Sequence, residues 1–254
     1  MILSLGIYQD LMCFAIFNPI LMRKQVMNIV CIPGLGANAL VFKPQQAYFA
    51  QRLYIPDFLK PKSQESLEAY SLRWAKQIKS NLRQPYVLLG MSLGGMLAQE
   101  MAQYLDAKAL ILLGSLQNPM PKQHLHQWGE KIGQALPNPI LKMIRYCSPH
   151  WVAWFEGLSQ EHKHLLQHMS RQIEIDFYKW QAQAAAAWIK TGFQGEYPCP
   201  VFRAHGGRDT VVYLDKELGP EDLFLPKARH LINLSHAQQI NAYIEQCIEK
   251  VQEP

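Results

Sequence analysis

The sequence predicts an α/β protein with a mostly parallel sheet flanked by helices, and two observations carry this prediction. From Met27 onward, short apolar runs alternate with helical patterns, which is typical of parallel strands joined by crossover helices. The strand candidates are apolar throughout, as expected when helices cover both faces of a sheet. The composition agrees, because 254 residues with 49% apolar and 18% charged side chains suit a globular protein with a sizeable core.

Apolar runs closed by turn residues predict six strands, at residues 28–32, 52–56, 86–89, 109–113, 201–204 and 231–233. A helix is predicted after Ser63 or Ser66, either of which can cap it, from the spacing of Leu67, Tyr70, Trp74, Ile78 and Leu82. A second helix follows residue 92, and an amphipathic helix is expected over residues 237–251.

Residues 117–197 have no strand signal and are predicted to form a helical cap insertion between the fourth and fifth strands. An insertion at the carboxyl end of a strand lies over the crevice where open α/β sheets bind ligands. The segment holds five of the six tryptophans, Trp128, Trp151, Trp154, Trp180 and Trp188. Two interpretations stay open: the rings pack the insertion against the sheet, or together they roof an apolar site.

Residues 1–26 are set apart from the expected domain at residues 27–254. They lack the positive start and the small-residue cleavage site of a signal peptide. Asp10 and Asn18-Pro19 interrupt the apolar run, so no stable membrane span is expected. The segment is either an extra element docked on the domain or an extension ahead of a start at Met27.

Charge and cysteine usage exclude several classes of protein. The net charge is +5, but Lys and Arg are scattered, so no nucleic-acid partner is expected. Five cysteines without a C-x-x-C spacing indicate free thiols in a reducing cytosol, hence a cytoplasmic protein. The sequence does not indicate an oligomeric state.

Neither a metal nor another cofactor is predicted. His164 and His168 are four residues apart and would share a helix face, but the surrounding polar segment favours a solvated face over a metal site. Gly34-Leu35-Gly36 lacks the third glycine of a dinucleotide site.

The stretch LGMSLGGM at residues 89–96 places Ser92 between glycines, where an apolar run ends and a helical pattern begins. A structural turn explains such glycines, but a G-x-S-x-G turn also exposes a nucleophilic serine. The motif alone is common, so the decision rests on finding a base and a group that orients it.

Two further residues follow late strand candidates, and both are expected at the same sheet edge as Ser92. Asp209 comes after the fifth run and His236 after the sixth, which predicts a base and an orienting acid beside the serine. Asp215 is the weaker candidate for the acid. His205 and His230 also flank late strands, but we expect them to be structural.

With this order of serine, aspartate and histidine, the sequence resembles the α/β-hydrolase superfamily over roughly residues 27–251. The resemblance implies the α/β-hydrolase fold, Ser92 as nucleophile, Asp209 as acid and His236 as base. It also implies an oxyanion hole made by the backbone N–H groups of Leu35 and Leu93. The chain departs from the family pattern at Pro33, where histidine is common, and at residues 233–235, where glycines often precede the base.

The expected activity is that of a serine hydrolase of the carboxylesterase or thioesterase type, acting through an acyl-enzyme on a small ester or thioester with an apolar portion. The pocket residues expected from the cap are Trp128, Met143, Tyr146, Trp151, Trp154 and Phe155. Two alternatives remain, namely lyase or perhydrolase chemistry on the same residues, and a ligand-binding protein on the same fold.

Overall fold

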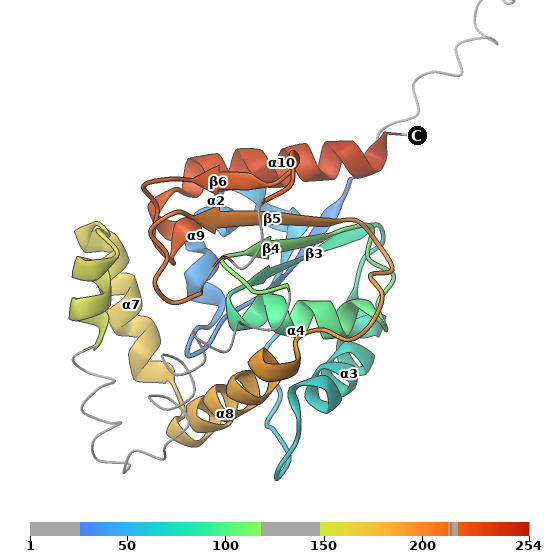
Figure 1. The fold of residues 1–254 in the computed structure, drawn as a ribbon, viewed down its shortest axis with the longest axis horizontal. Coiled ribbons are helices and arrows are strands. Elements are labelled where there is room, and N and C mark those ends of the chain that lie inside the picture. The colour runs from blue at the N-terminus through green and yellow to red at the C-terminus, as the bar shows by residue number, and fades with distance from the viewer. Residues whose placement is uncertain (1–25, 118–147, 213, 215–217, 254) are drawn as a thin grey trace, which may run out of the picture.

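A six-stranded parallel sheet forms the centre of the molecule in the computed structural model, which describes residues 26–117, 148–212, 214 and 218–253 (Figure 1). The strand order is β2-β1-β3-β4-β5-β6, and every neighbouring pair is parallel. The strands are β1 (Asn28–Ile32), β2 (Leu53–Tyr54), β3 (Tyr86–Met91), β4 (Leu110–Leu113), β5 (Val201–Gly206) and β6 (Leu223–Leu225). The predicted fold class is therefore confirmed.

Helices cover both faces of the sheet, which explains why the central strands are apolar on both sides. One face carries α2 (Lys43–Phe49), α9 (Ile232–Ser235) and α10 (Ala237–Gln252), and the other carries α3 (Leu67–Ile78) and α4 (Leu93–Ala102) (Figure 1). The buried side chains accordingly form two apolar clusters, one on each face. Short 3-10 turns lie at Ala39–Phe42, Ala50–Arg52 and Lys79–Asn81.

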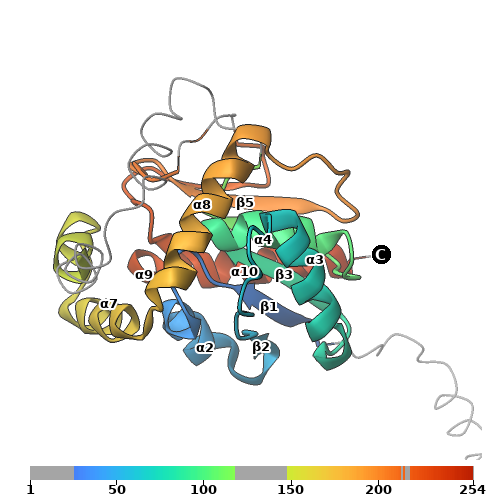
Figure 2. The same ribbon diagram turned by 90° about the horizontal axis from the view of Figure 1, so that it is seen from below.

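The described part of the segment between β4 and β5 is helical, at residues 148–155, α7 (Gln160–Gln172) and α8 (Ile175–Thr191). In Figure 2, α8 crosses the face formed by α3 and α4. Two tryptophans fix it there: Trp180 Nε1 donates to Glu65 O at 2.9 Å, and Trp188 Nε1 donates to Glu100 Oε1 at 2.7 Å. These two rings therefore pack the insertion against the body.

The prediction of a sixth strand at residues 231–233 is wrong. The strand is β6, at Leu223–Leu225, and residues 232–235 form α9 instead. β6 is an edge strand of three residues with the side chain of Phe224 exposed, so its apolar signal is weak. Asp222 holds this edge through Arg203 in β5, whose Nε and Nη2 lie 2.9 and 2.7 Å from Asp222 Oδ2.

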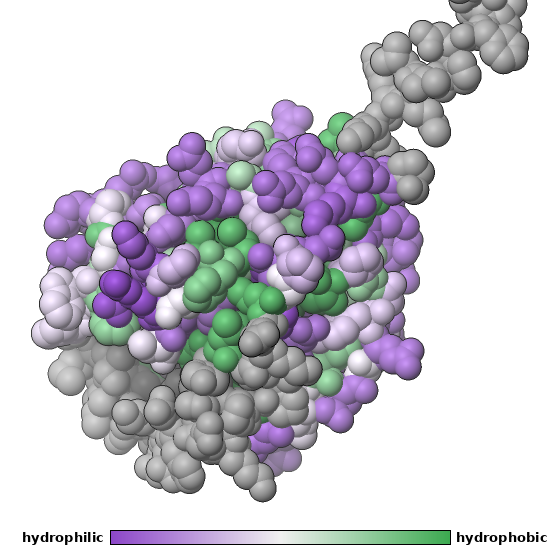
Figure 3. Space-filling view, turned by 45° about the horizontal axis from the view of Figure 1, so that its top comes forward, coloured by the Kyte–Doolittle hydropathy of each residue, from purple (hydrophilic) through white to green (hydrophobic). Residues whose placement is uncertain are grey.

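The other predicted helices and strands lie close to the observed ones. α3 begins after Ser66, whose Oγ accepts a hydrogen bond from Ala69 N, as the capping prediction required. α10 spans the predicted residues. In Figure 3, hydrophilic side chains predominate in the upper part of the view. Residues 1–25 lie outside the described residues, and within the described part no helix has the length and apolar character to cross a membrane.

The junction between β3 and α4 requires glycine. Ser92 has φ 55° and ψ −123°, so the chain turns sharply between strand and helix. A Cβ atom on Gly94 would lie 2.0 Å from Ile32 O, and one on Gly90 would lie 2.4 Å from Gly95 Cα. In both cases the obstructing atom belongs to the backbone, so no side-chain movement relieves the clash.

Gly94→Ala should therefore destabilise the protein by about 1–3 kcal/mol or more, because the α4 backbone must move away from β1. Urea unfolding followed by circular dichroism measures the loss. Gly219→Ala is the control, since a Cβ atom there would come no closer than 3.6 Å to Asp222 Oδ2, and it should change the free energy of unfolding by no more than about 0.5 kcal/mol. Equal effects at the two positions would contradict this account of the junction.

Candidate active site

Ser92 is held at the carboxyl edge of the sheet by backbone hydrogen bonds. Its N–H donates to Leu113 O at 2.9 Å, and its carbonyl accepts from Ser115 Oγ at 2.7 Å. The residue is 5% exposed. A non-glycine residue with positive φ costs roughly 1–3 kcal/mol, and such strain persists only where the surroundings fix it. The end of β4 supplies that support here.

Asp209 lies in the turn after β5, and its carboxylate is fully buried. Oδ1 accepts hydrogen bonds from Val211 N at 2.8 Å and Val212 N at 2.9 Å, so the turn itself orients the side chain. Burial alone would raise the pKa of this carboxyl. The facing His230 and the hydrogen bonds from His230 and Val212 outweigh that effect and bring the pKa of Asp209 below its usual range.

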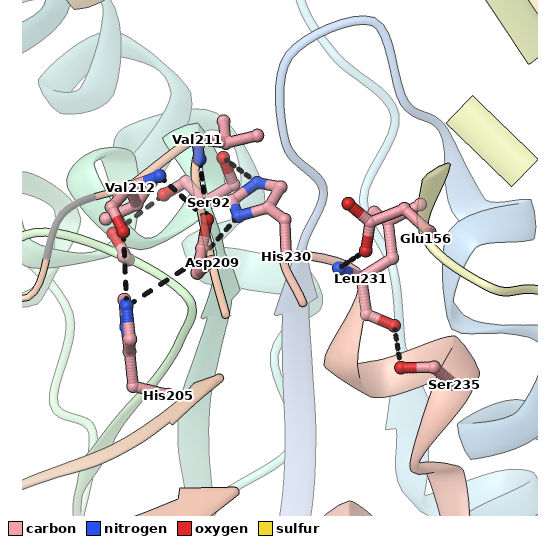
Figure 4. A network of polar contacts seen from close by, with 10 residues as sticks. Ser92, Glu156, His205, Asp209, Val211, Val212, His230, Leu231 and Ser235 are labelled. Carbon is pink, nitrogen blue, oxygen red and sulfur yellow. Dashed lines mark hydrogen bonds and ion pairs between the residues drawn. The ribbon is translucent and has the colours of Figure 1, made fainter. Parts of the chain in front are cut away.

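His230 lies between Ser92 and Asp209 (Figure 4). Its Nδ1 is 2.8 Å from Asp209 Oδ2, and its Nε2 is 3.0 Å from Ser92 Oγ. An ionised carboxylate only accepts hydrogen bonds, so Nδ1–H donates to Asp209. In the neutral ring, Nε2 is then the acceptor that faces the serine hydroxyl. This tautomer is the one that can remove the proton of Ser92.

The prediction that His236 lies between Ser92 and Asp209 is wrong, and the misplaced strand explains the error. We expected the histidine after a strand at residues 231–233, but β6 ends at residue 225 and the loop after it carries His230. His236 instead follows α9, and its Nδ1 lies 3.0 Å from Ser235 Oγ. The short apolar run at residues 223–225 is the signal in the sequence that could have identified the strand.

His205 packs beside the turn that carries Asp209, a role that the sequence did not indicate. Its ring is buried, and burial lowers the pKa of the imidazole so that the neutral form is favoured. Nε2 donates to Val212 O at 3.2 Å and lies 3.8 Å from Asp209 Oδ2. His205 therefore fixes the turn that presents Asp209. The weaker candidate for the acid, Asp215, lies outside the described residues.

The loop after β1 packs directly against Ser92. A Cβ atom on Gly34 would lie 3.0 Å from Met91 O and 3.2 Å from Ser92 Cβ. Gly36 N–H donates to Gln181 Oε1 at 3.1 Å, so α8 fixes the far end of this loop. Leu35, between them, lines the cavity beside Ser92. Leu93 N–H is the first of α4, and the first N–H groups of a helix have no partner within it.

A cavity of about 300 Å³ opens beside Ser92 and His230. Its walls are mostly aliphatic and come from the β1 loop, from residues 148–152 and from α7 and the start of α8. The insertion contributes Val152, Leu166, Met169, Ile173, Ile175 and Tyr178.

Three of the predicted pocket residues lie in the part of the chain that the structure describes, and they do not line this cavity. Trp151, Trp154 and Phe155 are 69%, 77% and 41% exposed and lie on the outer surface, so the prediction is wrong for these three. Helix geometry explains the difference, because within residues 148–155 the cavity is lined by Ser148, Pro149 and Val152. Trp128, Met143 and Tyr146 lie outside the described residues.

Among the described residues, no group of three or more His, Cys, Asp or Glu side chains could hold a metal ion. The two histidines with possible metal spacing lie exposed on α7, with His164 Nδ1 3.2 Å from Gln167 Oε1 and His168 Nε2 3.2 Å from Gln172 Nε2. In the part of the chain that the structure describes, Cys31, Cys199 and Cys247 are free.

Comparison with known proteins gives one family and many structural neighbours. The model of the alpha/beta hydrolase family matches residues 29–243. A thermophilic esterase from Thermogutta terrifontis is 18% identical, with a TM-score of 0.62 over 89% of this chain and 91% of that chain. An epoxide hydrolase from Bacillus megaterium is 11% identical, with a TM-score of 0.71 over 89% and 94%. No curated protein matches the sequence.

Asp209→Asn should reduce stability most above about pH 4. The folded-state pKa of Asp209 is depressed, so its contribution is present above the unfolded pKa of about 3.9 and is lost as pH falls through the folded pKa. Near pH 7 we expect a loss of about 1–3 kcal/mol in the free energy of unfolding, measured by urea titration from pH 3 to 7. Asp106→Asn, at an exposed carboxylate, is the control. A difference from wild type that does not shrink with acidification would contradict this assignment.

Proposed function

Because the chain belongs to the alpha/beta hydrolase family, we propose that it is a serine hydrolase of the carboxylesterase or thioesterase type. Its substrate is an ester or thioester with an apolar portion, cleaved through an acyl-enzyme intermediate. One observation carries the proposal, namely the imidazole of His230 within hydrogen-bond distance of both Ser92 Oγ and Asp209 Oδ2. A serine hydroxyl needs such an oriented base to act as a nucleophile.

In the proposed reaction, Ser92 Oγ attacks the acyl carbonyl carbon while His230 Nε2 takes the hydroxyl proton. The imidazolium then gives this proton to the leaving alkoxide or thiolate, and the acyl-enzyme remains. A water molecule then attacks the acyl carbon while His230 Nε2 takes its proton, and His230 returns this proton to Ser92 Oγ as the carboxylic acid leaves. Asp209 keeps the proton of His230 on Nδ1 and stabilises the charged ring.

The oxyanion of the tetrahedral intermediate needs two donors near Ser92. The N–H groups of Leu35 and Leu93 are the candidates, because the Gly34 backbone lies against Ser92 and Leu93 begins α4. The helix terminus adds a favourable partial positive charge. One such donor contributes about 3–4 kcal/mol to the transition state in a comparable hydrolase.

The aliphatic walls of the cavity support an apolar acyl group as the part of the substrate bound there. At about 300 Å³, the cavity is at the lower end of small-molecule sites, which favours short to medium acyl chains. Lyase or perhydrolase chemistry and simple ligand binding are the alternatives. An ester assay and covalent labelling of Ser92 separate them, because lyase or perhydrolase chemistry predicts no ester turnover and ligand binding predicts no covalent adduct.

Ser92→Ala and His230→Ala should each lower kcat/KM for an activated ester by about 10⁴-fold, because each removes part of the nucleophile–base pair. His236→Ala is the matched control and should retain activity within a few fold. Hydrolysis of p-nitrophenyl esters and labelling by a fluorophosphonate probe provide the two measurements. Full activity in His230→Ala, or its loss in His236→Ala alone, would overturn the assignment of the base.

Lengthening the acyl chain should raise kcat/KM up to about fourfold per methylene, equal to about 0.8 kcal/mol, until the cavity is full. Met169→Trp reduces the space and should shift the optimum to shorter chains, whereas Trp151→Ala, at an exposed side chain off the cavity, should leave it unchanged. A series of p-nitrophenyl esters from acetate to palmitate measures this. A flat profile in the wild-type protein would mean that the cavity does not bind the acyl group.

A further inference from the structure

Both chain neighbours of His230 are held by two consecutive residues of the insertion. Phe155 contacts Arg229, and Glu156 contacts Leu231 (Figure 4 shows the second contact). We propose that Phe155 and Glu156 are positioning residues that hold the loop of His230, so that its ring stays within reach of Ser92. This inference rests on the proposed function and extends it from the three reacting side chains to the insertion.

The Glu156 contact is short and buried. Its Oε2 accepts a hydrogen bond from Leu231 N at 2.8 Å, and the residue is 7% exposed. Leu231 is the N-cap residue of α9, and its carbonyl accepts from Ser235 Oγ at 3.0 Å. The backbone on the C-terminal side of His230 is therefore fixed at its N–H by the insertion and at its C=O by α9.

The Phe155 contact holds the other neighbour. The guanidinium carbon of Arg229 lies 4.1 Å from the centre of the Phe155 ring, a cation–π geometry. Phe155 is 41% exposed and belongs to neither of the two apolar clusters of the core. The two contacts restrain the chain before and after residue 230, and Asp209 restrains the ring itself.

The helical segment that carries this pair also lines the substrate cavity. Ser148, Pro149 and Val152 face the cavity, and Phe155 and Glu156 follow within one turn of Val152. A displacement of this segment by an unsuitable acyl group would therefore be transmitted to the loop of His230. A misplacement of about 1 Å at a reacting group can lower the rate about 100-fold.

The chemistry of Glu156 supports a functional reason for its presence. Burial raises the pKa of this carboxyl, and Asp209 acts in the same direction, while Leu231 N–H, His230 and Arg229 act against it. Among the described residues, Glu156 forms no ion pair. Because the pKa of Glu156 is higher in the folded than in the unfolded state, its ionised form destabilises the fold. The free energy of unfolding therefore falls as pH rises from the unfolded-state pKa through the folded-state pKa. The interaction that the structure shows for this buried carboxyl is therefore its hydrogen bond to Leu231 N–H, next to His230 in the chain.

The test compares Glu156→Leu, Glu156→Gln and Phe155→Ala in the full-length protein, with p-nitrophenyl butyrate as substrate. Glu156→Leu removes the acceptor and should lower kcat by about 10- to 100-fold with KM changed less than threefold. Glu156→Gln keeps an oxygen acceptor and should restore kcat to within about fivefold of wild type. Phe155→Ala should lower kcat several fold without lowering Tm.

Glu100→Leu is the matched control, because Glu100 is also a part-buried carboxyl whose pKa is raised by burial, but its partner is Trp188 and not the site. It should lower Tm and leave kcat unchanged. The second readout is the downfield proton resonance of His230 Nδ1–H in one-dimensional NMR, identified by its absence in His230→Ala. This resonance should broaden or shift in Glu156→Leu and persist in Glu100→Leu.

The outcomes distinguish failure of this inference from failure of the proposed function. If Ser92→Ala abolishes turnover but kcat and the NMR resonance are unchanged in folded Glu156→Leu and Phe155→Ala, the positioning role is overturned and the hydrolase assignment stands. If Glu156→Leu does not fold, Phe155→Ala decides, and wild-type kcat in that variant overturns the role. Absence of ester turnover in the wild-type protein overturns the proposed function itself.

Discussion

The geometry of the site depends on one imidazole that must reach two partners at once. Ser92 follows β3, Asp209 follows β5, and β4 lies between these strands in the sheet. His230 must therefore reach across the end of β4, where the chain continues as Gly114 with φ 51°. A Cβ atom there would lie 3.3 Å from His230 O and 3.5 Å from Asp209 Oδ2. The absence of a side chain at residue 114 leaves the space through which the bridge forms.

The same constraint explains the strained serine and the buried aspartate. Ser92 is turned out of the strand direction by its positive φ, which places its hydroxyl near the ring of His230. Asp209 accepts hydrogen bonds from two backbone N–H groups in addition to its contact with His230, and these bonds stabilise the charge of the carboxylate. Both side chains are thus held in place by the backbone, as the electrostatic preorganisation of the proposed reaction requires.

The fold and two of the three bridged side chains could be predicted from sequence, and the third could not, for a physical reason. β1, β3 and β4 are buried on both faces, so continuous apolar runs identify them, and β5 is recognisable from the shorter run at its start. β6 is an edge strand with Phe224 exposed, and the stronger apolar run after it belongs to α9. The prediction of the pocket residues in the cap was wrong for a related reason, because aromatic content does not indicate which face of residues 148–155 meets the cavity.

The two halves of the insertion are attached to the body differently, and this difference bears on how the pocket works. α8 is fixed to the body by the hydrogen bonds of Trp180 to Glu65 O and of Trp188 to Glu100 in α4. α7 packs through Leu165, Leu166 and Met169 near the β1 loop, and the segment before it reaches the body at the loop of His230. The segment before α7 therefore contributes both to the cavity wall and to the support of the His230 loop, whereas α8 contributes Ile175 and Tyr178 to the cavity and holds the β1 loop through Gln181. Under the proposed function, a substrate that fits the aliphatic walls would contact the same segment that holds the loop of His230, which would couple substrate binding to the position of the base.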